Sequence, residues 1–228
     1  LFPNLQSIET AMPSLRKSLC RELNSCQYLK RVTLTHIEKA EKGSIDVLAS
    51  VHQLTHLNLE ATSPQVWPAK NLVLAKRLKY LSLHQCTLFC GLSLSALGSL
   101  RELHMTNIRV TTDDIEHSIA TIPDLRRLRL EGTDIGATSL PILKKHRSLT
   151  QLSVARNSEL TDASLTLVVP FLPNLTDLNL SGTPVSAAFL AHIVRLQHLS
   201  ILDLSSTSVP HHARQYVEEE LRGIQLRL

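Results

Sequence analysis

Three side chains that could bind a metal ion, those of His84, Cys86 and Cys90, lie close together in the sequence. Imidazole nitrogen and thiolate sulfur are the ligands that Zn²⁺ prefers in structural sites. Such a site normally uses two ligand pairs of similar spacing, and the other two cysteines, Cys20 and Cys26, are separated by five residues and do not form a matching pair. We therefore predict no metal site and interpret the cysteines as core or turn residues.

The motifs of nucleophilic and nucleotide-dependent catalysis are also absent from the sequence. There is no Gly-x-Ser-x-Gly elbow, and "EGTDIGATS" (131–139) contains Gly132 and Gly136 without the spacing of a phosphate-binding loop. We interpret Gly132 and Gly182 as turn residues, because each precedes a threonine in two similar segments. The sequence therefore predicts a protein that is not an enzyme, has no cofactor and takes no small-molecule substrate.

The overall composition indicates a globular protein with an aliphatic core. Of the 228 residues, 43% are hydrophobic and 19% are charged, while only 4% are aromatic. The net charge is +4 and the basic residues are dispersed, so charge alone gives little support for a nucleic-acid partner. The longest apolar run, "LTLVVPFL" (165–172), contains Pro170 and is too short to cross a bilayer, so we expect no membrane insertion.

Cysteine usage and the first residue bear on the cellular compartment. Four cysteines in 228 residues are too few for a disulfide scaffold, which predicts an intracellular protein. We expect the cytoplasm, with mitochondria as the alternative because the pI is about 9.0. Because the chain begins at Leu1 rather than at Met, we expect that an upstream segment precedes it.

The elements that position these residues follow from an internal repeat, seen in "LTDLNLSGTPV" (175–185). Its pattern is L-x-x-L-x-L, then a polar residue at the ninth place and an apolar residue at the eleventh. Clear copies are "LKYLSLHQCTL" (78–88), "LRRLRLEGTDI" (125–135) and "LSILDLSSTSV" (199–209), and weaker copies reach from residue 5 to residue 226. The copies start at a mean spacing of 24 residues.

This pattern resembles the leucine-rich repeat family over essentially the whole chain. The segment "NSELTDASL" (157–165) is similar to the cysteine-containing, ribonuclease-inhibitor-like intracellular type, which often follows an F-box motif. The resemblance implies an α/β solenoid, a right-handed horseshoe with a concave parallel sheet and short convex helices. It also implies scaffold or adaptor roles, among which a fold alone does not choose.

The residues of each copy predict the same architecture. Alternating leucines indicate a short strand with one buried face, and the ninth residue turns inward, where its polar group must bond to the turn backbone. Helical spacing follows in segments 44–54, 140–149, 164–175 and 187–199, and "HHARQYVEEELRG" (211–223) predicts a polar helix after Pro210.

The repeat pattern also predicts the domain organisation. We expect one solenoid over residues 1–228, because each copy must stack on its neighbours to bury its leucines. Within it we expect a degenerate N-terminal repeat or cap at 1–28, core repeats at 29–209, and a C-terminal cap helix and last strand at 210–228.

The repeat register predicts which side chains project from the concave sheet. They occupy the third, fifth, seventh and eighth places of each copy, and the last copy, "LRGIQL" (221–226), then has Gly223 and Gln225 at its third and fifth places. The surface carries tyrosine and arginine, which are enriched at binding hot spots, and histidines, which suggest pH-dependent binding. The expected partner-binding residues are His56, Tyr80, His84, Glu102, His104, Arg127, Arg129, Arg156, Asp177, Asn179 and Asp203.

We therefore expect another protein or a large protein complex as the partner. The chain would act as a scaffold or adaptor, as a subunit or assembly factor of that complex. Two alternatives remain open. One is the substrate receptor of a ubiquitin ligase, which requires an F-box motif upstream. The other is an RNA- or ribonucleoprotein-binding subunit that uses Arg127, Arg129 and Arg156.

Overall fold

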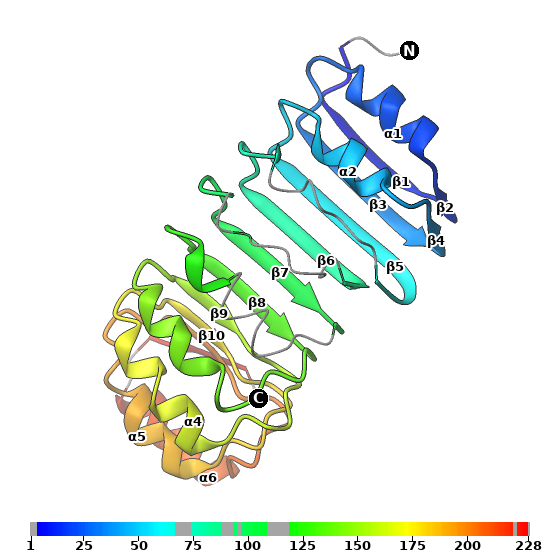
Figure 1. Cartoon of the computed structure of the whole chain (residues 1–228). Coiled ribbons are helices and arrows are strands. Elements are labelled where there is room, and N and C mark those ends of the chain that lie inside the picture. Colours follow the sequence, from blue (N-terminus) through cyan, green and yellow to red (C-terminus); the bar gives the residue numbers. More distant parts are fainter. Residues whose placement is uncertain are drawn as a thin grey trace. The chain divides into compact units, whose positions relative to one another are not determined.

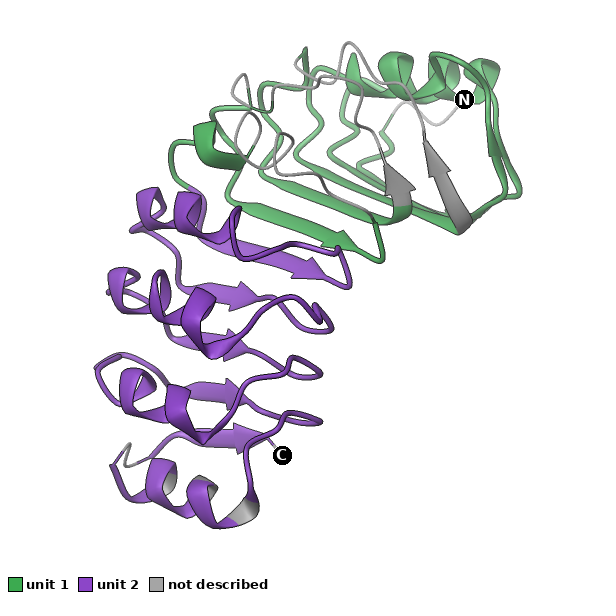
Figure 2. Ribbon diagram, turned by 60° about the horizontal axis from the view of Figure 1, so that its bottom comes forward, with its two compact units in different colours: residues 1–108, 117–124 green, residues 109–116, 125–228 purple. Residues whose placement is uncertain are grey.

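The computed structural model describes residues 4–66, 74–87, 94, 97–108, 119–220 and 223–227. The chain divides into two compact units, which Figure 2 shows in different colours. Unit 1 comprises residues 1–108 and 117–124, and unit 2 comprises residues 109–116 and 125–228. In both units, parallel strands are followed by short helical turns, as the repeat pattern predicts.

Unit 1 contains a parallel sheet in which neighbouring strands are successive copies of the repeat. Its strands, in spatial order, are β1 (Ser7–Ala11), β3 (Arg31–Ile37), β5 (His56–Val66), β6 (Tyr80–Thr87) and β7 (Glu102–Thr106), as Figure 1 shows. Strand β1 pairs with β3 over its full length, so the weakest copy in the sequence still forms a regular strand. A second small sheet joins β2 (Ser14–Leu15) to β4 (Lys39–Ala40).

Helices α1 (Lys17–Asn24) and α2 (Ser44–Ala49) lie on one side of this sheet (Figure 1). The Glu41 carboxylate accepts a hydrogen bond from the Lys17 backbone N–H at 2.7 Å, which satisfies one of the unpaired donors at the start of α1. The helix predicted over 44–54 is confirmed in its first half only, because α2 ends at Ala49 and the chain then turns toward β5. A 3₁₀ turn, Ile119–Thr121, completes the described helical segments of this unit.

Unit 2 repeats the same arrangement with shorter strands. Its parallel sheet contains, in spatial order, β8 (Arg127–Glu131), β9 (Gln151–Ser153), β10 (Asp177–Asn179), β11 (Ile201–Asp203) and β12 (Gln225–Arg227). The helical turns gather on one side of these strands (Figure 2).

The helical segments of unit 2 differ in type from the predicted helices. The segment expected at 140–149 is a 3₁₀ helix, η4 (Leu140–Lys145), and the one at 187–199 consists of η6 (Ala187–Phe189) and α5 (Leu190–Ile193). A 3₁₀ helix rises about 2.0 Å per residue, more than an α-helix, so the six residues of η4 span about 12 Å along the back of the coil.

Proline breaks one of the helices that the sequence predicts in unit 2. Over 164–175 the structure has α4 (Asp162–Thr166) and then a separate turn, η5 (Val169–Phe171), because Pro170 cannot donate the helical hydrogen bond. The prediction after Pro210 is confirmed, since α6 (His211–Glu220) occupies that segment.

The leucines of the repeat form the core of both units. First-place residues are at most 8% exposed from Leu29 to Leu199, and the fourth-place residues Leu57, Leu103, Leu128 and Leu178 are at most 1% exposed. Since aliphatic groups contribute about 25 cal/mol for each Å² removed from water, the stacked leucines are the main stabilising element within each unit.

The eighth residue of most copies turns the chain in the left-handed backbone conformation. The φ angle lies between 52° and 66° at His36, Gln85, Asn107, Gly132, Arg156, Gly182 and Ser206. This conformation directs the backbone N–H toward the next coil: Gly132 donates to the Ala155 carbonyl at 2.9 Å and Gly182 to the Ser205 carbonyl at 2.8 Å. The interpretation of both glycines as turn residues is confirmed.

The ninth residue points into the core, as predicted. Thr133 is fully buried and Thr183 is 2% exposed. The Thr183 hydroxyl donates to the Leu180 carbonyl at 2.6 Å, and the Thr133 hydroxyl donates to the Leu130 carbonyl at 3.2 Å. The buried hydroxyl of each threonine therefore forms a hydrogen bond within its own coil.

Candidate functional site

The predicted register on unit 1 is confirmed by the strand pairing. His56 of β5 lies opposite Tyr80 of β6, which lies opposite Glu102 of β7. Two residues further along the strands, Ser82 lies opposite His104. These side chains share the face of the sheet that the helices do not cover, because side chains alternate along a strand and the intervening residues are buried leucines. We call this surface the open face of unit 1.

Three of the predicted residues form a row of rings on this face. The His56 and Tyr80 rings are stacked, with centroids 5.8 Å apart and planes inclined by 26°. Tyr80 meets His104 edge to face, with a centroid distance of 5.1 Å, and its hydroxyl lies 3.3 Å from His104 Nδ1. All three rings are half-buried, so each restricts the rotamers of its neighbour while one side stays accessible.

The first ring of the row, His56, lies in a cationic environment. The Thr55 hydroxyl lies 2.8 Å from His56 Nδ1. Burial lowers the pKa of His56, and Arg31 and Lys79 act in the same direction, while the carboxylate of Glu102 acts against them. The neutral form of this imidazole is therefore favoured, and a neutral ring stacks on Tyr80 without the cost of desolvating a charge.

The remaining predicted residues of unit 1 lie beside this row. His84 is half-buried at the seventh place of its copy, opposite Glu60 of β5 and Thr106 of β7. Glu102, at the third place of its copy and the first residue of β7, lies opposite Tyr80. The open face of unit 1 thus contains His56, Tyr80, His84, Glu102 and His104 on adjacent strands.

The strand pairing of unit 2 confirms the predicted register except at the last strand. Arg129, Ser153, Asn179 and Asp203 form one row across β8 to β11. On β12, Gln225 lies opposite Ile201, and Arg227 lies opposite Asp203. The prediction that Gln225 occupies the fifth place was therefore wrong by two residues, because it started the last copy at Leu221, 22 residues after Leu199, whereas Arg227 follows Asp203 at the regular spacing of 24 residues.

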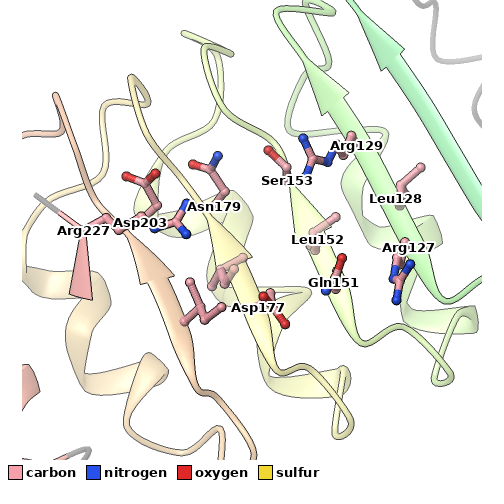
Figure 3. Close-up of a pocket in the computed structure, with 12 residues that line it drawn as sticks. Arg127, Leu128, Arg129, Gln151, Leu152, Ser153, Asp177, Asn179, Asp203 and Arg227 are labelled. Carbon is pink, nitrogen blue, oxygen red and sulfur yellow. The ribbon is translucent and has the colours of Figure 1, made fainter. Parts of the chain in front are cut away.

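Unit 2 has a shallow depression on its own open face, the face opposite its helical turns (Figure 3). Its volume is about 180 Å³. Arginines stand at both ends, with Arg127 and Arg129 on β8 and Arg227 on β12, and the aspartates lie between them (Figure 3). The other lining residues are Leu128, Gln151, Leu152, Ser153, Leu178, Asn179 and Ile201.

Glu131 connects two of the predicted arginines at the end of β8. Its carboxylate lies 3.8 Å from Arg129 Nη1 and 3.7 Å from Arg156 Nη2, and it accepts a hydrogen bond from the Ser153 hydroxyl at 2.7 Å. The Glu131 side chain is 16% exposed, whereas those of Arg129 and Arg156 are 54% and 56% exposed. One carboxylate therefore faces two guanidinium groups, which leaves this edge positively charged.

The acidic and amide side chains in the middle of the face are held by local hydrogen bonds. Asp203 Oδ1 accepts from the Ser205 N–H at 3.0 Å and from its hydroxyl at 2.7 Å. Asn179 Oδ1 accepts from the Ser181 N–H at 2.9 Å, and Asp177 Oδ2 accepts from the Thr176 hydroxyl at 2.6 Å. A carboxylate has about four acceptor positions, so both aspartates keep capacity for a further donor.

The candidate metal ligands fall partly outside the described part of the chain. Cys90 and the side chain of Cys86 are not described, so their predicted core or turn positions remain predictions. Cys20 and Cys26 are buried free thiols, and burial raises the pKa of the Cys20 thiol to about 11, which makes it unreactive. No group of three or more possible ligands occurs among the described residues.

The described helices also bear on the predicted absence of a membrane span. None of them is both long and apolar enough to cross a bilayer.

Some residues of these faces were not predicted from the sequence. Glu131 was missed, although its seventh place in the copy assigns it to the open face, and Arg227 was missed because of the register error. Gln151, Ser153 and Ile201 occupy third and fifth places, which the register assigns to the open face, but they were not among the expected partner-binding residues.

Solved structures share this fold at low sequence identity. The internalin inlF from Listeria monocytogenes matches with a TM-score of 0.65 at 18% identity, over 91% of this chain and 56% of that chain. A chain of the mouse RP105/MD-1 complex matches with a TM-score of 0.66 at 18% identity, over 98% of this chain and 39% of that chain. The TLR13–ssRNA13 complex matches with a TM-score of 0.53 at 17% identity, over 99% of this chain and 42% of that chain.

At these identities the similarity shows the fold alone, and the chain spans only about half of the internalin. No curated protein matches the sequence. The family model of the At1g61320/AtMIF1 leucine-rich repeat domain matches residues 68–224, more than half of the chain. The cysteine-containing subtype stays a prediction, whereas repeat pattern, parallel sheets and family match agree on the wider group. The chain belongs to the leucine-rich repeat family and has its α/β solenoid fold.

Proposed function

We propose that this chain is a non-enzymatic interaction domain that binds another protein through the open faces of its sheets. Leucine-rich repeat domains typically present an extended surface for macromolecules rather than a catalytic pocket. The proposed role is that of a scaffold or adaptor within a larger complex. The buried free thiols of Cys20 and Cys26 support a location inside the cell, where thiols stay reduced.

The row of His56, Tyr80 and His104 is the observation that carries this proposal. Tyrosine supplies a large contact area with few rotatable bonds, and here the neighbouring rings already restrict it. A partner that packs on this row would therefore lose little side-chain entropy on binding. A purely solubilising surface requires polar groups but does not require rings in mutual contact.

Affinity purification from the native cell, with quantitative mass spectrometry, tests the proposal. We expect Tyr80→Ala to lose partners that the wild type captures, because it removes the centre of the row. Tyr28→Ala is the matched control, since Tyr28 is 54% exposed and does not belong to an open face. If Tyr80→Ala and Tyr28→Ala capture the same proteins in the same amounts as wild type, the open face of unit 1 is not the binding surface.

RNA binding is the second candidate, favoured by the positive edge formed by Arg129, Arg156 and the neighbouring Arg127. A partner of this type would release counterions, so its affinity would fall steeply with salt. Among the similar folds, one structure is a complex with MD-1 and another is a complex with ssRNA13. An absence of single-stranded RNA binding at about 50 mM salt would exclude this candidate.

A further inference from the structure

The open face of unit 2 carries a pattern of charge that constrains its partner. Arg127 and Arg129 lie on β8, Asp177 lies two strands away on β10, and Asp203 lies on β11. Because neighbouring strands are about 4.8 Å apart, the arginine pair is separated across the sheet by about 10 Å from Asp177 and by about 14 Å from Asp203. All four side chains line the depression, which lies entirely within unit 2 (Figure 3).

We infer that this depression binds an extended protein segment with a basic side chain about 10 Å from an acidic one. The basic group lies over Asp177, and the acidic group lies over Arg127 and Arg129. This inference rests on the proposed function, and it names the chemistry of the partner segment.

The spacing fits an extended polypeptide. An extended strand rises about 3.3 Å per residue and a polyproline II helix about 3.1 Å, so 10 Å corresponds to about three residues. In a polyproline II segment, residues three apart also project from the same side. Between Arg127 and Asp177, the Gln151 side chain of β9 can bond to the peptide backbone of such a segment, and Ile201, opposite Asp177 on β11, offers a small apolar contact.

The same pattern disfavours partners of a single charge. A nucleic acid would bring phosphates against Asp177 and Asp203, whose carboxylates are held in place by Thr176 and Ser205. A uniformly basic peptide would meet the positive edge at Arg129 and Arg156. Only an occupant with both signs meets opposite charge at both positions.

A peptide-display selection on the full chain tests this inference. The probe is a library of random 12-residue peptides, and synthetic versions of the enriched peptides are then measured by fluorescence anisotropy. We expect enrichment of peptides with a basic residue two to four positions from an acidic one. Asp177→Arg should weaken their binding about fivefold, since it removes one exposed charge pair and places a like charge beside the basic group of the peptide. Exchanging the basic residue of the peptide for glutamate should restore binding to that variant.

Glu159→Arg is the matched control, because it makes the same type of change at an exposed residue of unit 2 outside the depression. The inference would be overturned if the selection enriched no peptides or only peptides of one charge sign. Tighter binding of single-stranded RNA than of the peptides, or equal effects of Asp177→Arg and Glu159→Arg on peptide binding, would overturn it as well. If it fails while Tyr80→Ala still loses native partners, the proposed function stands; if Tyr80→Ala loses none, the proposed function fails separately.

Discussion

Asn157 and Thr133 occupy the same place in adjacent coils, and Asn157 Oδ1 accepts a hydrogen bond from the Thr133 backbone N–H at 2.9 Å. The same oxygen accepts from the Ile135 N–H at 3.3 Å, while Nδ2 donates to the carbonyls of Leu130 at 2.6 Å and Val154 at 2.8 Å. Asn157 is 1% exposed, so these bonds join two turns out of contact with water.

Replacing Asn157 with alanine should therefore be costly for stability. The change removes the bonds of Asn157 to the buried N–H groups of Thr133 and Ile135 and to the carbonyls of Leu130 and Val154, and we expect a loss of about 3 kcal/mol in the free energy of unfolding. Urea denaturation measures it. Asn174→Ala is the control, because its side chain makes one exposed bond, to the Arg147 carbonyl. Equal losses in the two variants would contradict the bridging role.

Gly182→Ala should destabilise the chain through the backbone. At Gly182 φ is 66°, and an added Cβ would lie 3.3 Å from Arg156 Cγ. We expect a loss of about 1–2 kcal/mol, the usual cost of the left-handed conformation with some crowding. At Gly136 a Cβ meets no heavy atom within 4 Å, so Gly136→Ala should be neutral or slightly stabilising. Thermal unfolding compares the two, and a neutral Gly182→Ala would refute this expectation.

His56 should make stability depend on pH. Its pKa in the folded chain lies below the usual 6.5, so the unfolded chain binds a proton first as the pH falls. The wild type therefore keeps its full stability above pH 6.5 and loses part of it as the pH falls toward the folded pKa. Compared with His56→Gln, the wild type should become relatively less stable between about pH 7.5 and 5.

Chemical denaturation at several pH values checks this difference. The exposed His198, changed to glutamine in the same way, controls for the loss of one imidazole. If both variants differ from wild type by amounts that do not change with pH, burial of His56 has no energetic consequence.

Glu131→Gln should strengthen binding to polyanions. The change removes the carboxylate that faces Arg129 and Arg156, and it leaves a side chain that can still accept the Ser153 hydroxyl. We expect elution from a heparin column at higher salt than wild type, because more positive charge is left unopposed. Glu159→Gln makes the same change in net charge at an exposed site, and an equal shift in that control would show an effect of net charge alone.

The sequence by itself determined the repeat, its buried leucines and the role of its turn residues. Leu128, Thr183 and Gly182 each lie where their place in the copy predicts, because a fixed period decides which side chains face inward. The same period assigned Tyr80 and Asp177 to open faces of the sheets.

Only the tertiary structure decided how these residues meet. Three features depend on rotamers and on the exact stacking of one coil on the next. They are the ring row around Tyr80, the bonds of Asn157 to the preceding coil and the position of Arg227 opposite Asp203. A single repeat cannot bury its leucine face alone. Its sequence therefore sets the direction of each side chain, whereas the partners of that side chain are set by neighbouring coils.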